Sequence, residues 1–269
     1  MNALTVSGGL LCAVCCAGAA EFTPPEERTF TAQLDGSEQR YLELLPQGFD
    51  AKAVHHVLIA LHGHGSDRHQ FATDPRGECK GARDAAAARG MIYISPDYRA
   101  KTSWMGPAAE ADLVQLIAEL RTRHKVGKVV IMGGSMGGTS ALIFTSLHPD
   151  LIAGVVSLNG TANMVEYRNF SDAIAASYGG TREAKPKEYR KRSAELNPKA
   201  FTMPIAFTVS GNDTAVPPDS VRRLATVLTK SNKHVLILDR PDAGHATSYA
   251  ETMQAMEFVL DRVLGKGKP

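Results

Sequence analysis

The stretch Gly133-Gly134-Ser135-Met136-Gly137 lies between a short apolar run, 128–132, and a helical pattern, 138–148, that stops at Pro149. The run is too short and too rich in β-branched residues for a helix, so it is typical of a buried strand. Glycines at such a junction let the backbone take a strained turn and leave room for neighbouring segments. The pattern predicts a serine hydroxyl held above a sheet in a tight strand-to-helix turn. A flexible glycine loop is the alternative that the pattern alone leaves open.

The rest of the chain alternates between strand and helix patterns. This alternation predicts an α/β fold, a doubly wound and mostly parallel sheet of about eight strands with helices on both faces. In such sheets, functional residues lie in loops at the carboxyl ends of strands, where Ser135 is placed. Strands are expected over 39–45, 54–61, 91–95, 128–132, 152–158, 205–209 and 234–238, and helices over 82–89, 108–124, 138–148, 218–231 and 247–264.

Residues 161–200 interrupt this alternation. They contain no clear strand and hold eight Lys or Arg against five acidic residues. Connections of this length are often lids over a site, so we expect a lid-like insertion. The charged residues are interpreted as a solvated helix face, with an anion-binding site as the alternative.

The first 20 residues differ from the remainder because they contain no charged side chain. The apolar stretch and the small residues Ala17-Gly18-Ala19 predict a secretory signal peptide cleaved after Ala19 or Ala20, although no Lys or Arg follows Met1. A disordered or buried N-terminal segment is the alternative. The stretch is too short to span a bilayer, so we expect no stable membrane insertion. Residues 21–269 then form a single domain that is secreted or periplasmic.

Composition excludes some classes of partner. The 269 residues carry a formal net charge of +2 and no basic block interleaved with aromatic residues, so nucleic acid is not an expected partner. Three of the four cysteines lie in the leader, and the remaining Cys79 has no partner for an internal disulfide. Its polar neighbours indicate an exposed loop. Oligomeric state is not indicated.

A serine nucleophile needs a base, and the base needs an acid to orient it. In this architecture the order along the chain is Ser, Asp or Glu, then His. Asp213 follows the strand at 205–209, and His245 lies between the last strand and the last helix. We expect Ser135, Asp213 and His245 to form a catalytic triad. Asp242 is a competing acid, whereas Asp219 is better suited to starting a helix.

The negative oxygen of a tetrahedral intermediate needs backbone N–H donors. The amide of Met136, next to the nucleophile, is one expected donor. The turn His62-Gly63-His64-Gly65 should supply the other, with His64 preferred and Gly65 as the alternative. A metal site on His62 and His64 is a weaker interpretation because no carboxylate or cysteine ligand is nearby.

With these residues, the chain resembles the α/β-hydrolases over about 39–264. Within this superfamily, two branches resemble the chain in three segments, which are Ser135-Met136-Gly137-Gly138, 95–99 and Gly211-Asn212-Asp213. One comprises secreted carbohydrate esterases that remove acetyl or feruloyl groups, and the other comprises catalytic domains of prolyl-oligopeptidase-type peptidases.

The resemblance implies a serine carboxylic ester hydrolase that uses no metal or organic cofactor, with a carbohydrate-linked ester as its expected substrate. Peptidases of this type usually add a propeller domain, for which 269 residues leave no room, so the peptidase is the second expectation. A non-catalytic carbohydrate-binding relative is the third. Trp104, the only tryptophan, is a candidate wall of the acyl pocket or a stacking surface for a sugar, with simple packing as the alternative.

Overall fold

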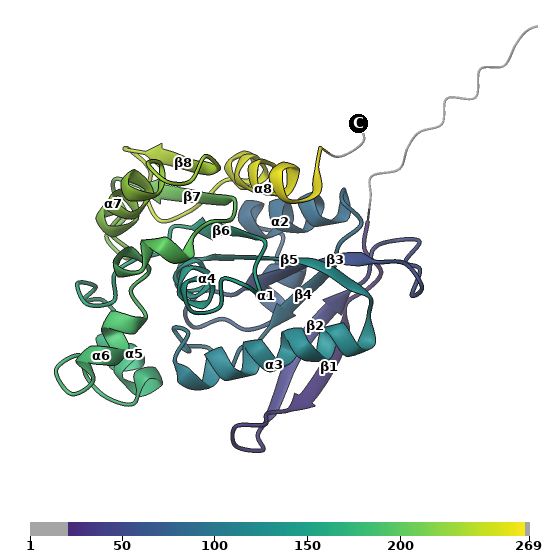
Figure 1. The fold of residues 1–269 in the computed structure, drawn as a ribbon, viewed down its shortest axis with the longest axis horizontal. Helices are drawn as coiled ribbons and strands as arrows, with labels where there is room; N and C mark the ends of the chain where they lie inside the picture. The colour runs from purple at the N-terminus through teal and green to yellow at the C-terminus, as the bar shows by residue number, and fades with distance from the viewer. Residues whose placement is uncertain (1–20, 267–269) are drawn as a thin grey trace, which may run out of the picture.

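A computed structural model describes residues 21–266. It contains one eight-stranded sheet flanked by helices, which confirms the predicted fold class (Figure 1). The strands are β1 (Glu26–Thr31), β2 (Glu38–Leu44), β3 (His55–Leu61), β4 (Ile92–Pro96), β5 (Val126–Gly134), β6 (Gly154–Leu158), β7 (Ile205–Ser210) and β8 (Val235–Arg240). The α-helices are α1 (His69–Thr73), α2 (Gly77–Ala87), α3 (Pro107–Arg123), α4 (Met136–Leu147), α5 (Ser171–Tyr178), α6 (Pro186–Lys191), α7 (Asp219–Leu228) and α8 (Tyr249–Leu264).

The strand order is β1-β2-β4-β3-β5-β6-β7-β8. β1 and β2 are antiparallel to their neighbours, and all strands from β4 to β8 pair in parallel. The carboxyl ends of β3, β5, β6, β7 and β8 therefore meet at one edge of the sheet. Every loop that carries a predicted catalytic residue starts at this edge.

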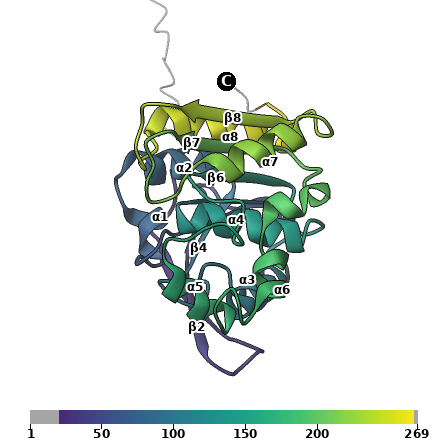
Figure 2. The same cartoon turned by 90° about the vertical axis from the view of Figure 1, so that its left-hand side faces the viewer.

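Two hydrophobic cores cover the two faces of the sheet. Alternate residues of a strand point to opposite faces, so Val57 and Ile59 of β3 join one core while Leu58 joins the other. α3, α4 and α7 contribute to the first core, and α1, α2 and α8 to the second. Figure 2, like Figure 1, shows α2 lying next to α8. No helix within residues 21–266 is both long and apolar enough to cross a bilayer.

Two elements at the periphery of the sheet were not predicted. β1 is an edge strand in which only Phe30 is buried, so it lacks the hydrophobic signal of a central strand. The short helix α1 follows the loop after β3 and buries only Phe71 and Ala72. Both escape pattern analysis because too few of their residues contact the core.

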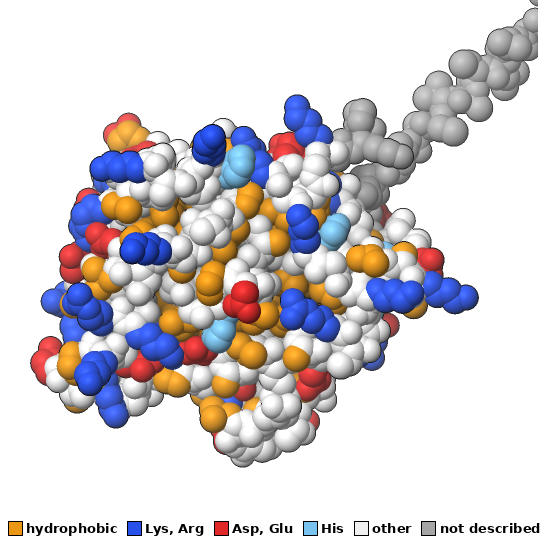
Figure 3. Space-filling view, in the orientation of Figure 1, with side chains coloured by type: hydrophobic (Ala, Val, Ile, Leu, Met, Phe, Trp, Pro, Cys, Tyr) orange, Lys and Arg blue, Asp and Glu red, His pale blue; other side chains and the backbone are white. Residues whose placement is uncertain are grey.

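The insertion at 161–200 consists of short helices, as Figure 1 shows at α5 and α6. On the face drawn in Figure 3, Lys and Arg side chains gather over α5, α6 and α7, with acidic side chains among them. The interpretation of the charged residues of this insertion as a solvated helix face is wrong for Arg192. Its side chain is fully buried and donates to Glu110, Glu188 and the Met105 carbonyl. A buried guanidinium needs this full set of acceptors.

The prediction that Cys79 lies in an exposed loop is also wrong, because this part of the chain is helical. The residue lies in α2 with none of its surface exposed. Its polar sequence neighbours Glu78 and Lys80 lie on other faces of the helix, which a linear reading cannot separate. Burial raises the pKa of the Cys79 thiol to about 12.

We expect the buried thiol to resist alkylation. At pH 8, a thiol of pKa about 12 is ionised in roughly one molecule in ten thousand, and only the thiolate reacts. Peptide mapping after iodoacetamide treatment should find Cys79 unmodified in the folded protein and modified in urea. Rapid labelling of Cys79 under native conditions would contradict the buried position.

Candidate active site

Ser135 lies at the junction between β5 and α4 in a strained backbone conformation. Its φ is 58° and its ψ is −120°, a conformation that costs a non-glycine residue about 1–3 kcal/mol. The Ser135 N–H donates to the Leu158 carbonyl at 2.8 Å, which ties the junction to the neighbouring strand β6. A Cβ on Gly137 would lie 2.0 Å from the backbone oxygen of Leu61. Glycine is thus required there by the close approach of β3.

His245 and Asp213 are brought together from two separate loops. Nδ1 of His245 is 2.7 Å from Oδ2 of Asp213. The other carboxylate oxygen, Oδ1, accepts from the Val216 N–H at 2.8 Å. The Asp213 side chain is 1% exposed and that of His245 is 39% exposed, so a buried acid holds a ring that substrate can reach.

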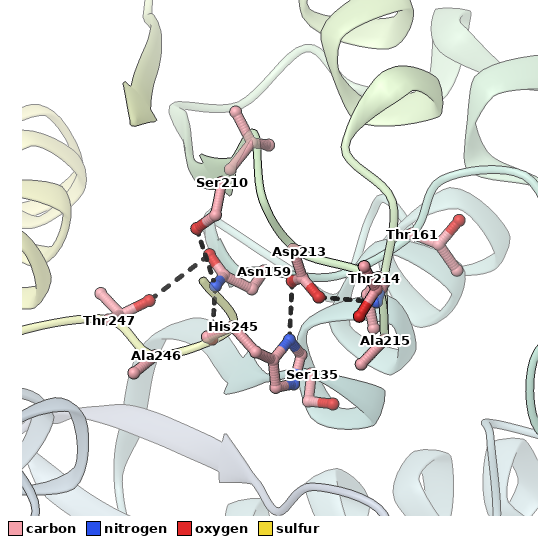
Figure 4. Close-up of polar contacts among 12 residues, drawn as sticks. Ser135, Asn159, Thr161, Ser210, Asp213, Thr214, Ala215, His245, Ala246 and Thr247 are labelled. Carbon is pink, nitrogen blue, oxygen red and sulfur yellow. Dashed lines mark hydrogen bonds and ion pairs between the residues drawn. The ribbon is translucent and has the colours of Figure 1, made fainter. Parts of the chain in front are cut away.

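Ser135 and His245 line the same cleft, of about 360 Å³. Figure 4 shows the Ser135 side chain beside the imidazole, on a different side of the ring from Asp213. Among the described residues, the Ser135 hydroxyl has no hydrogen-bond partner. A hydroxyl that closes onto its base only with substrate bound is common at catalytic sites.

The competing acids lie elsewhere. Asp219 is the first residue of α7, with a side chain 72% exposed, and it pairs with Arg222. Asp242 contributes its backbone carbonyl, which accepts from the Asn212 side chain. The structure therefore pairs His245 with Asp213.

Two amides of the loop after β3, those of His64 and Gly65, were considered as oxyanion donors, and among the described residues only that of His64 is free. The Gly63 N–H donates to the Gln70 side chain at 2.7 Å, and the Gly65 N–H donates to the Lys101 carbonyl at 2.8 Å. The N–H groups of His64 and Met136 have no acceptor within residues 21–266. Gly63 lies close to the nucleophile, since a Cβ built on it would be 3.7 Å from that of Ser135. His64 rather than Gly65 thus remains the candidate donor beside Met136.

The His62 ring is already engaged by backbone groups. Nδ1 lies 2.9 Å from the Gly63 carbonyl and Nε2 lies 3.2 Å from that of Asp97. Burial lowers the pKa of His62. Within residues 21–266, no group of three or more His, Cys, Asp or Glu side chains is arranged to hold a metal ion. The His62–His64 pair does not provide one either, because the buried His62 ring has both nitrogens toward backbone carbonyls and Nδ1 of His64 accepts from the Trp104 indole.

Trp104 differs from its predicted role. Its side chain is fully buried and is not part of the lining of the Ser135 cleft, so it offers no face for a sugar to stack on. Its indole instead packs against Tyr167 and Phe170, with ring centroids 5.5 and 5.4 Å away. The indole N–H donates to Nδ1 of His64 at 3.0 Å.

Two polar residues behind the triad were missed by the sequence analysis. Asn159, at the carboxyl end of β6, donates from Nδ2 to the His245 carbonyl at 2.5 Å (Figure 4). Arg240 donates to Oδ1 of Asn159 and to the Ala246 carbonyl, at 2.5 and 2.7 Å. Together they hold the backbone carbonyls of His245 and of the residue that follows it. Asn159 has a φ of 48°, and its position directly after a strand is the only signal that the sequence offers.

We expect Asn159→Ala to weaken both fold and catalysis. The change removes the donor to the His245 carbonyl and leaves the Arg240 guanidinium without one acceptor. Losing partners of a partly buried charge costs about 2 kcal/mol of unfolding free energy. We also expect kcat to fall by about tenfold or more, because a small displacement of a catalytic group has large effects on rate.

Asn232→Ala is a matched control. Asn232 is also buried and also donates to two carbonyls, those of Phe201 and Met203, outside the cleft. It should lower the urea midpoint by a similar amount and leave kcat of the folded protein unchanged. Equal kcat losses in the two variants would show that Asn159 acts through stability alone.

The fold and the Ser135 turn define the chain as an α/β-hydrolase. Its sequence matches the prolyl oligopeptidase family over residues 83–262, about two thirds of the chain. The chain belongs to the prolyl oligopeptidase family, a family of serine hydrolases. The matched range includes Ser135, Asp213 and His245. The resemblance to the prolyl-oligopeptidase-type branch is thus confirmed, while the resemblance to carbohydrate esterases stays a prediction.

Solved structures show the same fold at low sequence identity. A puromycin hydrolase is 20% identical with a TM-score of 0.70, over 92% of this chain and 40% of its own. A Pyrococcus horikoshii acylaminoacyl peptidase is 17% identical with a TM-score of 0.70, over 93% of this chain and 43% of its own. A Pyrococcus furiosus esterase is 16% identical with a TM-score of 0.65, over 90% of this chain and 93% of its own.

The chain spans less than half the length of the first two of these proteins, and most of the length of the third. No curated protein matches the sequence.

Proposed function

We propose that this protein hydrolyses carboxylic esters through an acyl-enzyme on Ser135, and that its substrate is an acetyl or feruloyl ester of a carbohydrate. The observation that supports the chemistry is the His245 ring, bonded on one side to the buried Asp213 and exposed beside Ser135 on the other. A serine with such a base can be activated at neutral pH.

The proposed reaction has two stages. Nε2 of His245 takes the proton of the Ser135 hydroxyl as Oγ attacks the ester carbonyl, and the amides of His64 and Met136 stabilise the oxyanion. The protonated His245 then gives its proton to the leaving alcohol. A water molecule, activated by the same imidazole, attacks the acyl-enzyme and releases the acid. Asp213 stabilises the imidazolium in both stages.

The lining of the cleft supports a polar substrate. Besides the catalytic pair, the cleft is bordered by Gln70, Arg76 and Glu78. These groups suit the hydroxyl groups of a sugar better than a long aliphatic chain. Secretion of the enzyme, proposed from residues 1–20, would bring it to extracellular polysaccharide; those residues lie outside the described part of the chain.

A peptidase is the second candidate, because the family match supports it directly. Two of the similar structures are an acylaminoacyl peptidase and a puromycin hydrolase. An amide needs stronger protonation of its leaving group, but the same three side chains can provide it.

A substrate panel distinguishes the two candidates. The purified protein is assayed on acetylated xylan, methyl ferulate, short p-nitrophenyl esters and aminoacyl-proline amides. The proposal expects turnover of the esters, with acetylated or feruloylated carbohydrate preferred, and negligible turnover of the amides. Turnover of the amides alone would replace the esterase with the peptidase. A protein that reacts with neither the panel nor an active-serine phosphonate would be a non-catalytic relative.

A further inference from the structure

His64 is held in one chemical form by its neighbour Trp104. The indole N–H is a donor only, and it points at Nδ1 of His64 at 3.0 Å. Nδ1 must therefore carry a lone pair, which places the single ring proton of the neutral imidazole on Nε2. Burial lowers the pKa of His64, which also favours the neutral ring.

The partner that imposes this form is itself immobilised. Trp104 is fully buried, its backbone N–H lies 3.4 Å from the sulfur of Met136, and its carbonyl accepts from the Tyr178 hydroxyl at 3.1 Å. Phe170 packs against both rings, with centroids 4.4 Å from that of His64 and 5.4 Å from that of Trp104. The indole donor therefore cannot turn away from His64 without disturbing this cluster.

The opposite edge of the imidazole is free. His64 lines the Ser135 cleft, and within residues 21–266 its Nε2 forms no hydrogen bond. His64 thus presents one N–H donor of fixed tautomer to the cleft beside the nucleophile. Such a group suits hydrogen bonding to an oxygen acceptor. It does not suit proton transfer, because its other nitrogen already accepts from the Trp104 indole.

We propose that Trp104 is a positioning residue that fixes the Nε2–H form of His64, and that this N–H is a side-chain hydrogen-bond donor to an oxygen of the bound ester. This inference rests on the proposed function and adds a substrate-binding residue to it. The donor is separate from the backbone N–H of His64, which the oxyanion hole uses.

His64→Ala isolates the side chain because it keeps the backbone amide. We expect kcat/KM on p-nitrophenyl acetate to fall by at least about tenfold, as for the loss of one hydrogen bond in a desolvated site. Trp104→Phe removes only the N–H donor and keeps a large ring in the cluster. It should lower kcat/KM by about threefold to tenfold, since the imidazole is then free to change tautomer and to turn, and the form with Nε2–H toward the cleft becomes a minority.

The double variant separates positioning from a structural role. If Trp104 acts through His64, adding Trp104→Phe to His64→Ala should change kcat/KM by less than twofold. An equally large further loss in the His64→Ala background would overturn the proposed coupling. Unchanged kcat/KM in His64→Ala would overturn the donor role.

The tautomer can be measured without any substrate. Nitrogen NMR of the imidazoles, with the His64 signals assigned by their loss in His64→Ala, should show Nε2 protonated in the wild type and mixed tautomers in Trp104→Phe. Phe170→Leu is the matched control: it removes an aromatic contact to the same ring but no hydrogen bond, so Nε2 should stay protonated. A wild-type signal with the proton on Nδ1 would overturn the inference. A wild type that cleaves no ester would overturn the proposed function while leaving this measurement intact.

Discussion

Ser135→Ala is expected to lower kcat on a short p-nitrophenyl ester by about a million-fold, the loss seen when a serine nucleophile is removed from a comparable triad. Without the hydroxyl no acyl-enzyme can form. The oxyanion-hole amides of His64 and Met136 can then stabilise only the direct attack of water on the ester. The side chain has no hydrogen-bond partner among the described residues, so its removal leaves no buried group unsatisfied. The unfolding midpoint should therefore change little.

Mass spectrometry provides an independent measurement. A phosphonate probe should add one covalent label to the wild type, at Ser135, and none to Ser135→Ala. Ser140→Ala is the control, because Ser140 lies in the same helix α4 but is fully buried. It should retain labelling. Full esterase activity in Ser135→Ala would refute the assignment of the nucleophile.

Asp213→Asn is expected to lower kcat by about 10⁴-fold, the size of the effect in a comparable triad. The reason follows from the two partners of the carboxylate. The Val216 N–H is a fixed donor to Oδ1, so the single oxygen of an asparagine must turn toward it. The asparagine NH₂ then faces Nδ1 of His245 and donates to it. The ring proton is forced onto Nε2, where the imidazole can no longer accept the proton of Ser135.

The pH dependence of this variant tests the tautomer argument. In the wild type, the neutral imidazole has its acceptor nitrogen toward Ser135. In Asp213→Asn, that nitrogen carries the single proton of the neutral ring, so raising the pH should not restore the rate. Asp242→Asn is the control, because the side chain of Asp242 takes no part in holding His245. If Asp242→Asn proved as damaging as Asp213→Asn, the acid would have been misassigned.

The polar network behind His245 shows why some of the site could not be predicted. Asn159 and His245 are 86 positions apart, and Arg240 and Asn159 are 81 apart. Neither residue has a spacing or motif that marks it, because each contributes one side chain to contacts made only after β6, β7 and β8 pair. The same holds for Trp104 and His64, which belong to separate loops 40 positions apart.

The burial of two side chains, those of Cys79 and Arg192, could not be predicted from the polar residues around them in the sequence. The polar sequence around Cys79 and the basic run around Arg192 both indicate solvent exposure, yet both side chains are fully buried. For Arg192, the acceptors Glu110 and Met105 come from outside the insertion and replace the water that the guanidinium loses.

The amino-acid sequence by itself determined the parallel sheet, the strained turn at Ser135 and the placement of Asp213 and His245 after their strands. These depend on short-range patterns: apolar runs of strand length, glycines at a turn, and the rule that functional loops follow the carboxyl ends of parallel strands. Only the tertiary structure decided which acid faces His245, which amide of the loop after β3 is free, and that the Trp104 indole donates to His64 instead of lining the cleft. Those outcomes depend on the direction of individual hydrogen bonds between distant segments, which no local pattern in the chain encodes.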